Sequence, residues 1–275
     1  MVHTWGFIAM IEYLQDGIIQ QALLALLLLI PLCALMGSTM LQMRLSYFGD
    51  SISHSAFSGL AIGMLLAIEP RAMILLFAIL ISLLMTYLQR HTKLALDSVI
   101  GVIQAGTVAF GLIVLSLKSG GMRSMQAYLF GDLLLIQSVD LAWLLLTLVL
   151  VALYQFIFAN QLILMSLHAE LSATHGVKTR WHPYIHNMLL ALVVAVGLRA
   201  IGLMLITALL VVPAAAARNV ASNVRQMFWL NLAFAAIAAL AGLGLSLYGN
   251  VNLGGAVVMV AIVLFFTTAF LRKRG

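Results

Sequence analysis

Long apolar runs, separated by short polar connections, recur along the chain from residue 17 to residue 271. Most are about 20 residues long, which lets a helix cross the hydrocarbon core of a bilayer. The pattern predicts nine membrane-spanning helices, at residues 17–38, 41–68, 71–89, 97–117, 136–159, 183–200, 201–217, 226–246 and 253–271. Only Arg199 and Gly202 separate the sixth span from the seventh, so eight or ten spans remain open.

The composition leaves no room for a sizeable soluble domain. Of the 275 residues, 64% are hydrophobic and 8% are charged, and the mean hydropathy is +1.14. We therefore expect an all-α, polytopic transmembrane helical bundle that forms one domain over residues 1–275. The amino terminus has no basic residue before the first apolar run and no small-residue cleavage pattern after it, so we expect the first span to be retained.

The basic residues indicate the orientation of the bundle. The formal net charge is +6, but the lysines and arginines lie singly at the ends of apolar runs, as topology signals rather than as a nucleic-acid-binding surface. A cytoplasmic carboxyl terminus places all but four of the 14 basic residues on the cytoplasmic side. The four on the outside are Arg71, Lys118, Arg123 and Arg199. We expect the amino terminus to be external.

The segment "SYFGDSISHSAFSG", residues 46–59, carries the strongest candidate for chemistry. If the second span starts near Leu41, Asp50 lies about 13 Å into the membrane, where an ionised aspartate costs ~2.5–3.5 kcal/mol. His54 is one turn further on the same helix face. A carboxylate and an imidazole can bind a zinc, manganese or iron ion, and two ligands suit transient binding during transport. A second copy of the chain could complete the ligand set. The alternative, that the pair only stabilises helix packing, stays open.

Small residues line the neighbouring face of the same helix, at Ser51, Ser55, Gly59 and Gly63. A ridge of this kind lets another helix approach closely, and we expect it to serve helix packing.

Three further residues are weaker candidates for the pathway or its entrance. Asp97 opens the fourth span and Asp132 precedes the fifth; helix capping is the simpler interpretation of each, and attraction of cations the alternative. Pro213 lies in "IGLMLITALLVVPAAAAR", where it bends a helix that either lines a pathway or packs in a static bundle.

The chain has no Gly-x-x-x-x-Gly-Lys-Ser/Thr phosphate loop and no His-Glu-x-x-His motif, which argues against ATP hydrolysis and zinc peptidase chemistry. Three segments instead resemble the permease subunits of bacterial ABC importers for zinc, manganese and iron: "MRLSYFGDSISHSAFSGLAIG" at 43–63, "AYLFGDLL" at 127–134 and "IGLMLITALLVVPAAAAR" at 201–218. The zinc-type members are the most similar.

The resemblance implies a type II-like permease in the bacterial inner membrane, which is not itself an enzyme and keeps no permanent cofactor. It implies a homodimer, two copies of a separate ATPase subunit and an external metal-binding protein as partners. Asp50 and His54 match the family's Asp-x-x-x-His, which is implicated in metal passage. Residues 160–182 would hold the coupling helix, with Glu170, Gly176 and Val177 at family positions.

Two other classes of function remain as alternatives. A secondary transporter driven by an ion gradient could use Asp50 as its titrating group. An intramembrane metal-dependent enzyme is disfavoured, because the sequence places no general base beside the pair.

Overall fold

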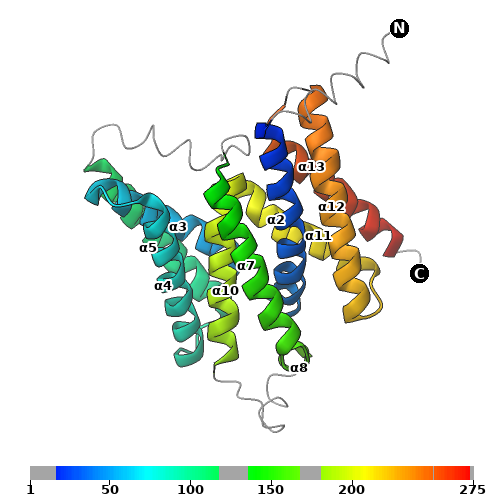
Figure 1. Cartoon of the computed structure of the whole chain (residues 1–275). Helices are drawn as coiled ribbons and strands as arrows, with labels where there is room; N and C mark the ends of the chain where they lie inside the picture. Colours follow the sequence, from blue (N-terminus) through cyan, green and yellow to red (C-terminus); the bar gives the residue numbers. More distant parts are fainter. Residues whose placement is uncertain (1–16, 118–135, 168–180, 250, 273–275) are drawn as a thin grey trace.

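The computed structural model describes residues 17–117, 136–167, 181–249 and 251–272, and over these ranges the chain forms ten helices and no strand (Figure 1). The helices are α2 (Gly17–Gln42), α3 (Ser46–Leu66), α4 (Pro70–His91), α5 (Leu96–Ser116), α7 (Ser138–Ile157), α8 (Ala159–Leu167), α10 (His182–Ile201), α11 (Leu203–Val220), α12 (Val224–Gly249) and α13 (Leu253–Arg272). The predicted all-α architecture is confirmed.

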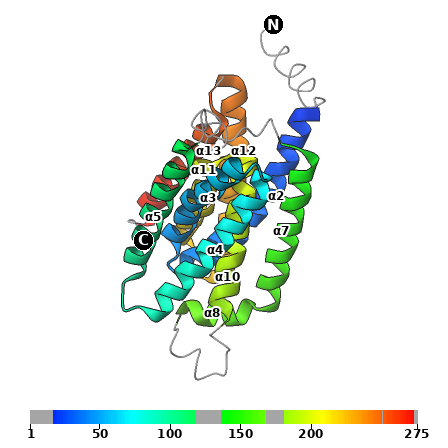
Figure 2. The same cartoon turned by 90° about the vertical axis from the view of Figure 1, so that its left-hand side faces the viewer.

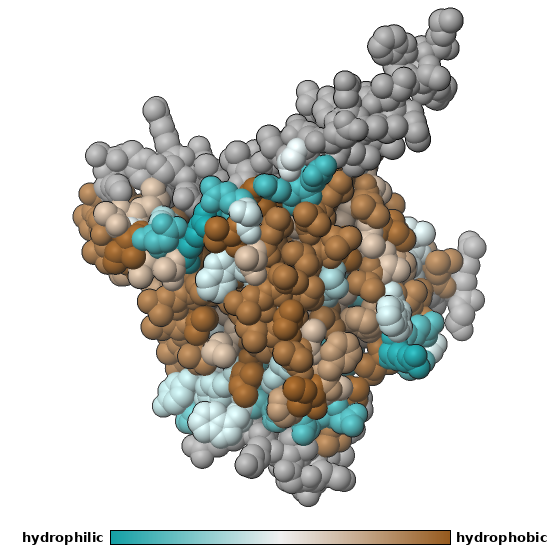
Figure 3. Space-filling view, viewed as in Figure 1, coloured by the Kyte–Doolittle hydropathy of each residue, from teal (hydrophilic) through white to brown (hydrophobic). Residues whose placement is uncertain are grey.

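Seven of these helices are long and apolar enough to cross a membrane. The other two long helices are α3, whose first half is rich in serine, and α11, whose apolar part is the shorter stretch Leu205–Val220. Figure 3 shows a hydrophobic belt between a hydrophilic band at the upper end of the bundle and another at the lower end. This distribution is the one expected of a protein that crosses a bilayer.

The second span was predicted to begin at residue 41, but its helix, α3, begins at Ser46. α2 continues to Gln42, and α3 starts only at Ser46 after a tight turn in which Arg44 adopts a φ of 59°. No proline or capping signal marks the end of α2. The polar residues 39 and 42, which belong to this helix, therefore resemble a loop between two spans. Asp50 consequently lies about 6 Å from the start of its helix, not 13 Å. The fifth span also ends early, since α8 starts at Ala159.

Gly202 separates α10 from α11, which confirms the weakest division in the sequence. Its φ of 82° and ψ of 168° belong to a backbone region that is essentially restricted to glycine. The backbone N–H of Gly202 donates to the carbonyl of Leu198 and so closes α10.

The helices pack as two groups joined by α2 and α10. α3, α4 and α5 form one group and α11, α12 and α13 the other (Figures 1 and 2). α2 packs against α7, α11 and α12, whereas α10 packs against α4, α7, α11 and α3. The apolar core runs through the faces where these helices meet.

Buried amides connect the central helices to their neighbours. Asn231 on α12 donates to the Ala34 carbonyl and to Ser38 Oγ of α2, both at 3.0 Å. Asn187 on α10 donates to Thr86 Oγ1 of α4 at 2.9 Å. Such interhelical hydrogen bonds fix the rotation of helices about their axes, because an apolar environment offers these groups no water.

Candidate functional site

The first half of α3 has one open face. Between residues 47 and 61, every side chain is buried except those of Tyr47, Asp50 and His54. These three positions follow a spacing of three and four residues, which places them on a single face of the helix. The pair is less enclosed than its place in an apolar sequence suggested, because 40% of the Asp50 side chain and 38% of the His54 side chain are exposed.

Asp50 and His54 point toward each other. Asp50 Oδ2 lies 3.8 Å from His54 Nε2. Two ligand atoms in a tetrahedral zinc site, each about 2.1 Å from the ion, are separated by about 3.4 Å. Small side-chain rotations therefore allow the pair to bind one ion. Within the described residues, no group of three or more histidine, cysteine, aspartate or glutamate side chains could hold a metal. A single chain thus offers two ligands here.

The serines of the small-residue ridge face the neighbouring helices α4 and α5. Ser51 Oγ lies 3.9 Å from Met85 Sδ on α4, and Ser55 Oγ lies 2.8 Å from Thr107 Oγ1 on α5. Ser58 Oγ also donates to the Thr107 carbonyl. These contacts fix how α3 is rotated about its axis, and so they hold the open face away from α4 and α5.

The glycines of the ridge allow a close crossing with α4. A Cβ atom at Gly59 would lie 2.6 Å from the Met73 carbonyl oxygen and 2.7 Å from Phe77 Cβ. At Gly63 the nearest atoms, in Met73 and Pro70, would lie 3.2–3.3 Å away. Only a residue without a side chain fits at Gly59.

The other predicted site residues are distributed differently. Asp97 is exposed in the first turn of α5, where a negative charge favours the helix dipole, but the N-cap is Ala95 and no side chain caps the helix. The prediction that Asp97 is a cap is therefore wrong. Pro213 is buried within α11. The remaining predicted positions, Asp132, Glu170, Gly176 and Val177, lie outside the described residues.

The sequence patterns did not predict a charged cluster that lies at the upper end of the bundle. Asp140, in the first turn of α7, is 7% exposed. Its Oδ1 lies 3.2 Å from Arg199 Nε of α10 and 3.8 Å from an Arg71 guanidinium nitrogen of α4, while Oδ2 accepts from the Gln137 backbone N–H at 3.1 Å. Arg71 Nη2 also donates to Gln137 Oε1 at 2.6 Å, and Arg71 Nε lies 3.4 Å from Glu69 Oε1.

The sequence does contain a signal for this cluster. Arg71 and Arg199 are two of the four basic residues expected on the external side, and Asp140 follows the predicted external start of the fifth span. All three therefore have the same expected depth in the membrane. Opposite charges at one depth in neighbouring spans would have suggested an ion pair.

Comparison with known proteins decides the family. The family model described as "ABC 3 transport family" matches residues 15–272, almost the whole chain. The chain belongs to this family.

Its curated relatives have similar lengths and different metals in their names. The chain is 29% identical over 253 residues to the high-affinity zinc uptake system membrane protein ZnuB of Haemophilus influenzae, with 92% of this chain and 97% of that protein covered. It is also 29% identical over 257 residues to the manganese import system permease protein ScaB of Streptococcus gordonii, covering 93% and 92%.

The solved structures agree with this assignment. A chain of PsaBC from Streptococcus pneumoniae in complex with Fab superimposes with a TM-score of 0.83 at 25% identity, over 95% of both chains. A putative metal-chelate type ABC transporter in an inward-facing conformation gives a TM-score of 0.73 at 16% identity, which supports the fold alone. The resemblance to permeases of metal-uptake ABC importers is confirmed, and with it the expectation of a membrane subunit rather than an enzyme.

Proposed function

We propose that this ABC 3 family chain is the permease subunit of an ATP-driven importer for a divalent metal ion, with zinc as the first candidate. Asp50 and His54 bind the ion transiently as it crosses the membrane. The observation that carries the proposal is the open face of α3, where the two ligand atoms lie 3.8 Å apart on an otherwise buried part of the helix.

Two chains are needed to complete the site. A zinc ion in a protein usually has four ligands, and the described part of one chain offers two at this position. A homodimer with its two-fold axis beside α3 brings the two Asp50–His54 pairs together around one ion. The same contact would cover Tyr47, which is 69% exposed one turn before Asp50.

Incomplete binding by each chain suits transport. A site split between two chains holds the ion while the chains are close and releases it when they move apart. We propose that two ATPase subunits drive this movement through residues 160–182, with Glu170, Gly176 and Val177 at the contact. α8 forms the first part of this segment. An external metal-binding protein delivers the ion.

The orientation in the bacterial inner membrane follows from charge. With the amino terminus external and the carboxyl terminus cytoplasmic, Arg90, Lys93, Arg218 and Arg225 lie at cytoplasmic helix ends. Arg71 and Arg199 remain at the external end, where both contact Asp140.

Manganese is the second candidate for the transported ion. A zinc uptake protein and a manganese import permease are equally similar to the chain, at 29% identity each. One carboxylate and one imidazole per chain can bind either metal.

Metal uptake by the complete transporter, reconstituted in vesicles, tests the proposal. Asp50→Asn and His54→Gln preserve side-chain size but weaken metal binding, so each should reduce ATP-dependent zinc uptake at least about tenfold. Ser98→Ala is the control, because Ser98 is an exposed residue in the first turn of α5 and is not one of the candidate site residues. Unchanged uptake in both α3 variants would contradict the ligand role.

Uptake without ATP that collapses with an uncoupler would contradict ATP-driven transport. Parallel measurements with manganese identify the preferred ion.

A further inference from the structure

An apolar groove with a charged end lies between α4 and α7, with α10 as its floor. The cavity has a volume of about 710 Å³. Leu76 and Ile79 of α4 form one wall, Val139 and Trp143 of α7 form the other, and Val196 belongs to the floor. Leu76, Val139 and Trp143 are 56%, 50% and 41% exposed, so the groove is open to the surroundings of the bundle.

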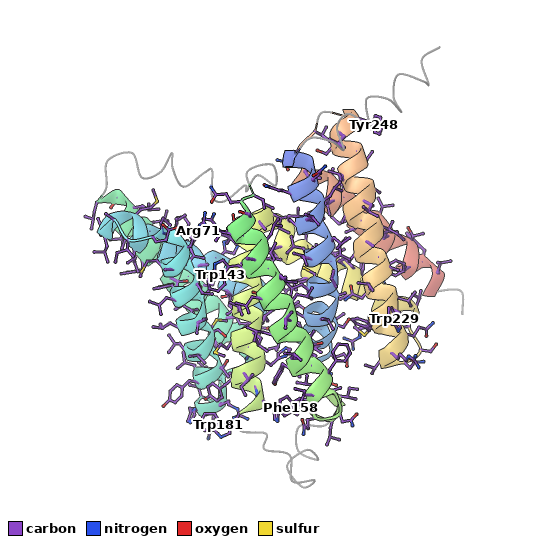
Figure 4. All side chains as sticks on the ribbon, viewed as in Figure 1. Arg71, Trp143, Phe158, Trp181, Trp229 and Tyr248 are labelled. Carbon is purple, nitrogen blue, oxygen red and sulfur yellow. The ribbon has the colours of Figure 1, made fainter. Side chains whose placement is uncertain are left out.

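The arginines of the charged cluster close the upper end of this groove. Arg71 and Arg199 both line the cavity together with Asp140. Figure 4 shows Arg71 at the upper end of the bundle and Trp143 below it, between α4 and α7. In Figure 3 the hydrophilic upper band gives way at this level to the hydrophobic belt. The groove therefore runs from a polar boundary into the apolar zone.

Arg71 and Arg199 can donate more hydrogen bonds to an anion than their described partners accept. Among the residues that the structure describes, Asp140 is the one buried carboxylate beside them, and both arginines share it. Arg71 Nε is buried and makes no hydrogen bond. Glu69 Oε1 lies 3.4 Å from this atom, but the Glu69 side chain is 64% exposed, and an ion pair with so exposed a group is weak.

We propose that this groove binds a phospholipid, whose phosphate contacts the guanidinium groups of Arg71 and Arg199 and whose acyl chain lies along the groove against Trp143. A phosphodiester carries one negative charge and accepts the bidentate hydrogen bonds that arginine donates. Exposed apolar walls at membrane depth suit a hydrocarbon chain, and tryptophan favours the boundary between headgroups and hydrocarbon.

The bound lipid would add a link between α4 and α7. At this end the two helices are connected by Arg71, which reaches Asp140 and Gln137. A phosphate held by Arg71 of α4 and Arg199 of α10, above an acyl chain that contacts both walls, extends this connection down the groove. The proposal rests on the membrane embedding of the chain and is independent of the transported metal.

Lipid titration of the purified, delipidated transporter in detergent tests the site. The probes are phosphatidylglycerol, a phosphate-free diacylglycerol glycolipid and inorganic phosphate, and the readouts are the thermal unfolding midpoint and the lipid retained in native mass spectrometry. We expect phosphatidylglycerol to raise the midpoint, and the other two probes to have little effect.

Variants separate the two parts of the site. Arg71→Gln removes the charge but leaves Arg199 with Asp140, and should weaken phosphatidylglycerol binding about tenfold. Ala72→Trp, at an exposed lining position, fills the groove without removing a charge and should weaken binding similarly. Lys93→Gln, an exposed basic residue at the opposite end of the bundle, is the control.

Equal binding by Arg71→Gln and Lys93→Gln would overturn the phosphate contact. An equal effect of the glycolipid would overturn it too, and an equal effect of inorganic phosphate would show a free-anion site instead.

Discussion

Among the glycines of α3, Gly59 is the position at which one added methyl group should disturb the packing most. It lies where α3 crosses α4, and a Cβ atom there would meet the Met73 carbonyl oxygen at 2.6 Å and Phe77 Cβ at 2.7 Å. Ordinary van der Waals contacts of a Cβ begin near 3.4 Å. Both obstacles belong to the helix backbone or to its first side-chain atom, so a rotamer change cannot relieve them.

The Gly59→Ala variant must therefore separate the two helices by about 0.8 Å at this point. Overpacking of this kind costs ~1–3 kcal/mol. Alanine gains up to ~1 kcal/mol over glycine in helix propensity, which offsets part of this cost. We expect a net loss of about 1–2 kcal/mol in the free energy of unfolding.

Two glycines provide matched controls for the same substitution. A Cβ at Gly106, in the middle of α5, would have no atom within 4 Å, and one at Gly49 would lie 3.5 Å from Met40 Sδ. Gly106→Ala and Gly49→Ala should be neutral or slightly stabilising. Unfolding in mixed detergent micelles, followed by circular dichroism, compares the three variants. If Gly59→Ala is as stable as Gly106→Ala, the close crossing of α3 and α4 is wrong.

The same assay tests three further features of the fold. Asp140→Asn removes the carboxylate between two partly buried arginines and should lower the free energy of unfolding by ~3 kcal/mol. Asp97→Asn, at an exposed position, should change it by less than ~0.5 kcal/mol. Equal effects of the two substitutions would contradict the ion-pair cluster. Asn231→Leu removes the hydrogen bond to Ser38 and should cost ~1 kcal/mol, so a more stable variant would show that this amide is dispensable. Gly202→Ala forces a side chain into a glycine backbone conformation and should cost ~1–3 kcal/mol, and an unchanged midpoint would contradict the turn between α10 and α11.

The sequence predicts the helices well, because apolar length reflects the thickness of a bilayer irrespective of tertiary contacts. The division at Gly202 could also be predicted, since glycine is the residue that permits its backbone angles. The start of α3 could not. Polar residues near the end of α2 look like a connection, but Thr39 accepts a hydrogen bond from Gln155 of α7, a partner 116 residues away.

The candidate site was predictable in its residues but not in its environment. The spacing of Asp50 and His54 is enough to place them on one helix face. Their exposure depends on which helices cover α3, and the contacts of Ser55 and Gly59 with α5 and α4 decide that. The cluster around Asp140 likewise requires three helices to bring their ends together, which single-span periodicity does not encode.

The coordination of a bound zinc ion tests the shared site most directly. X-ray absorption spectroscopy and equilibrium binding on the zinc-loaded transporter should show one ion per two chains, with only nitrogen and oxygen ligands at about 2.0–2.2 Å, including imidazole. His54→Gln should remove the imidazole contribution, and Asp50→Asn should weaken binding. One tightly bound ion per chain, or an imidazole signal that survives in His54→Gln, would contradict a site shared by two copies of α3.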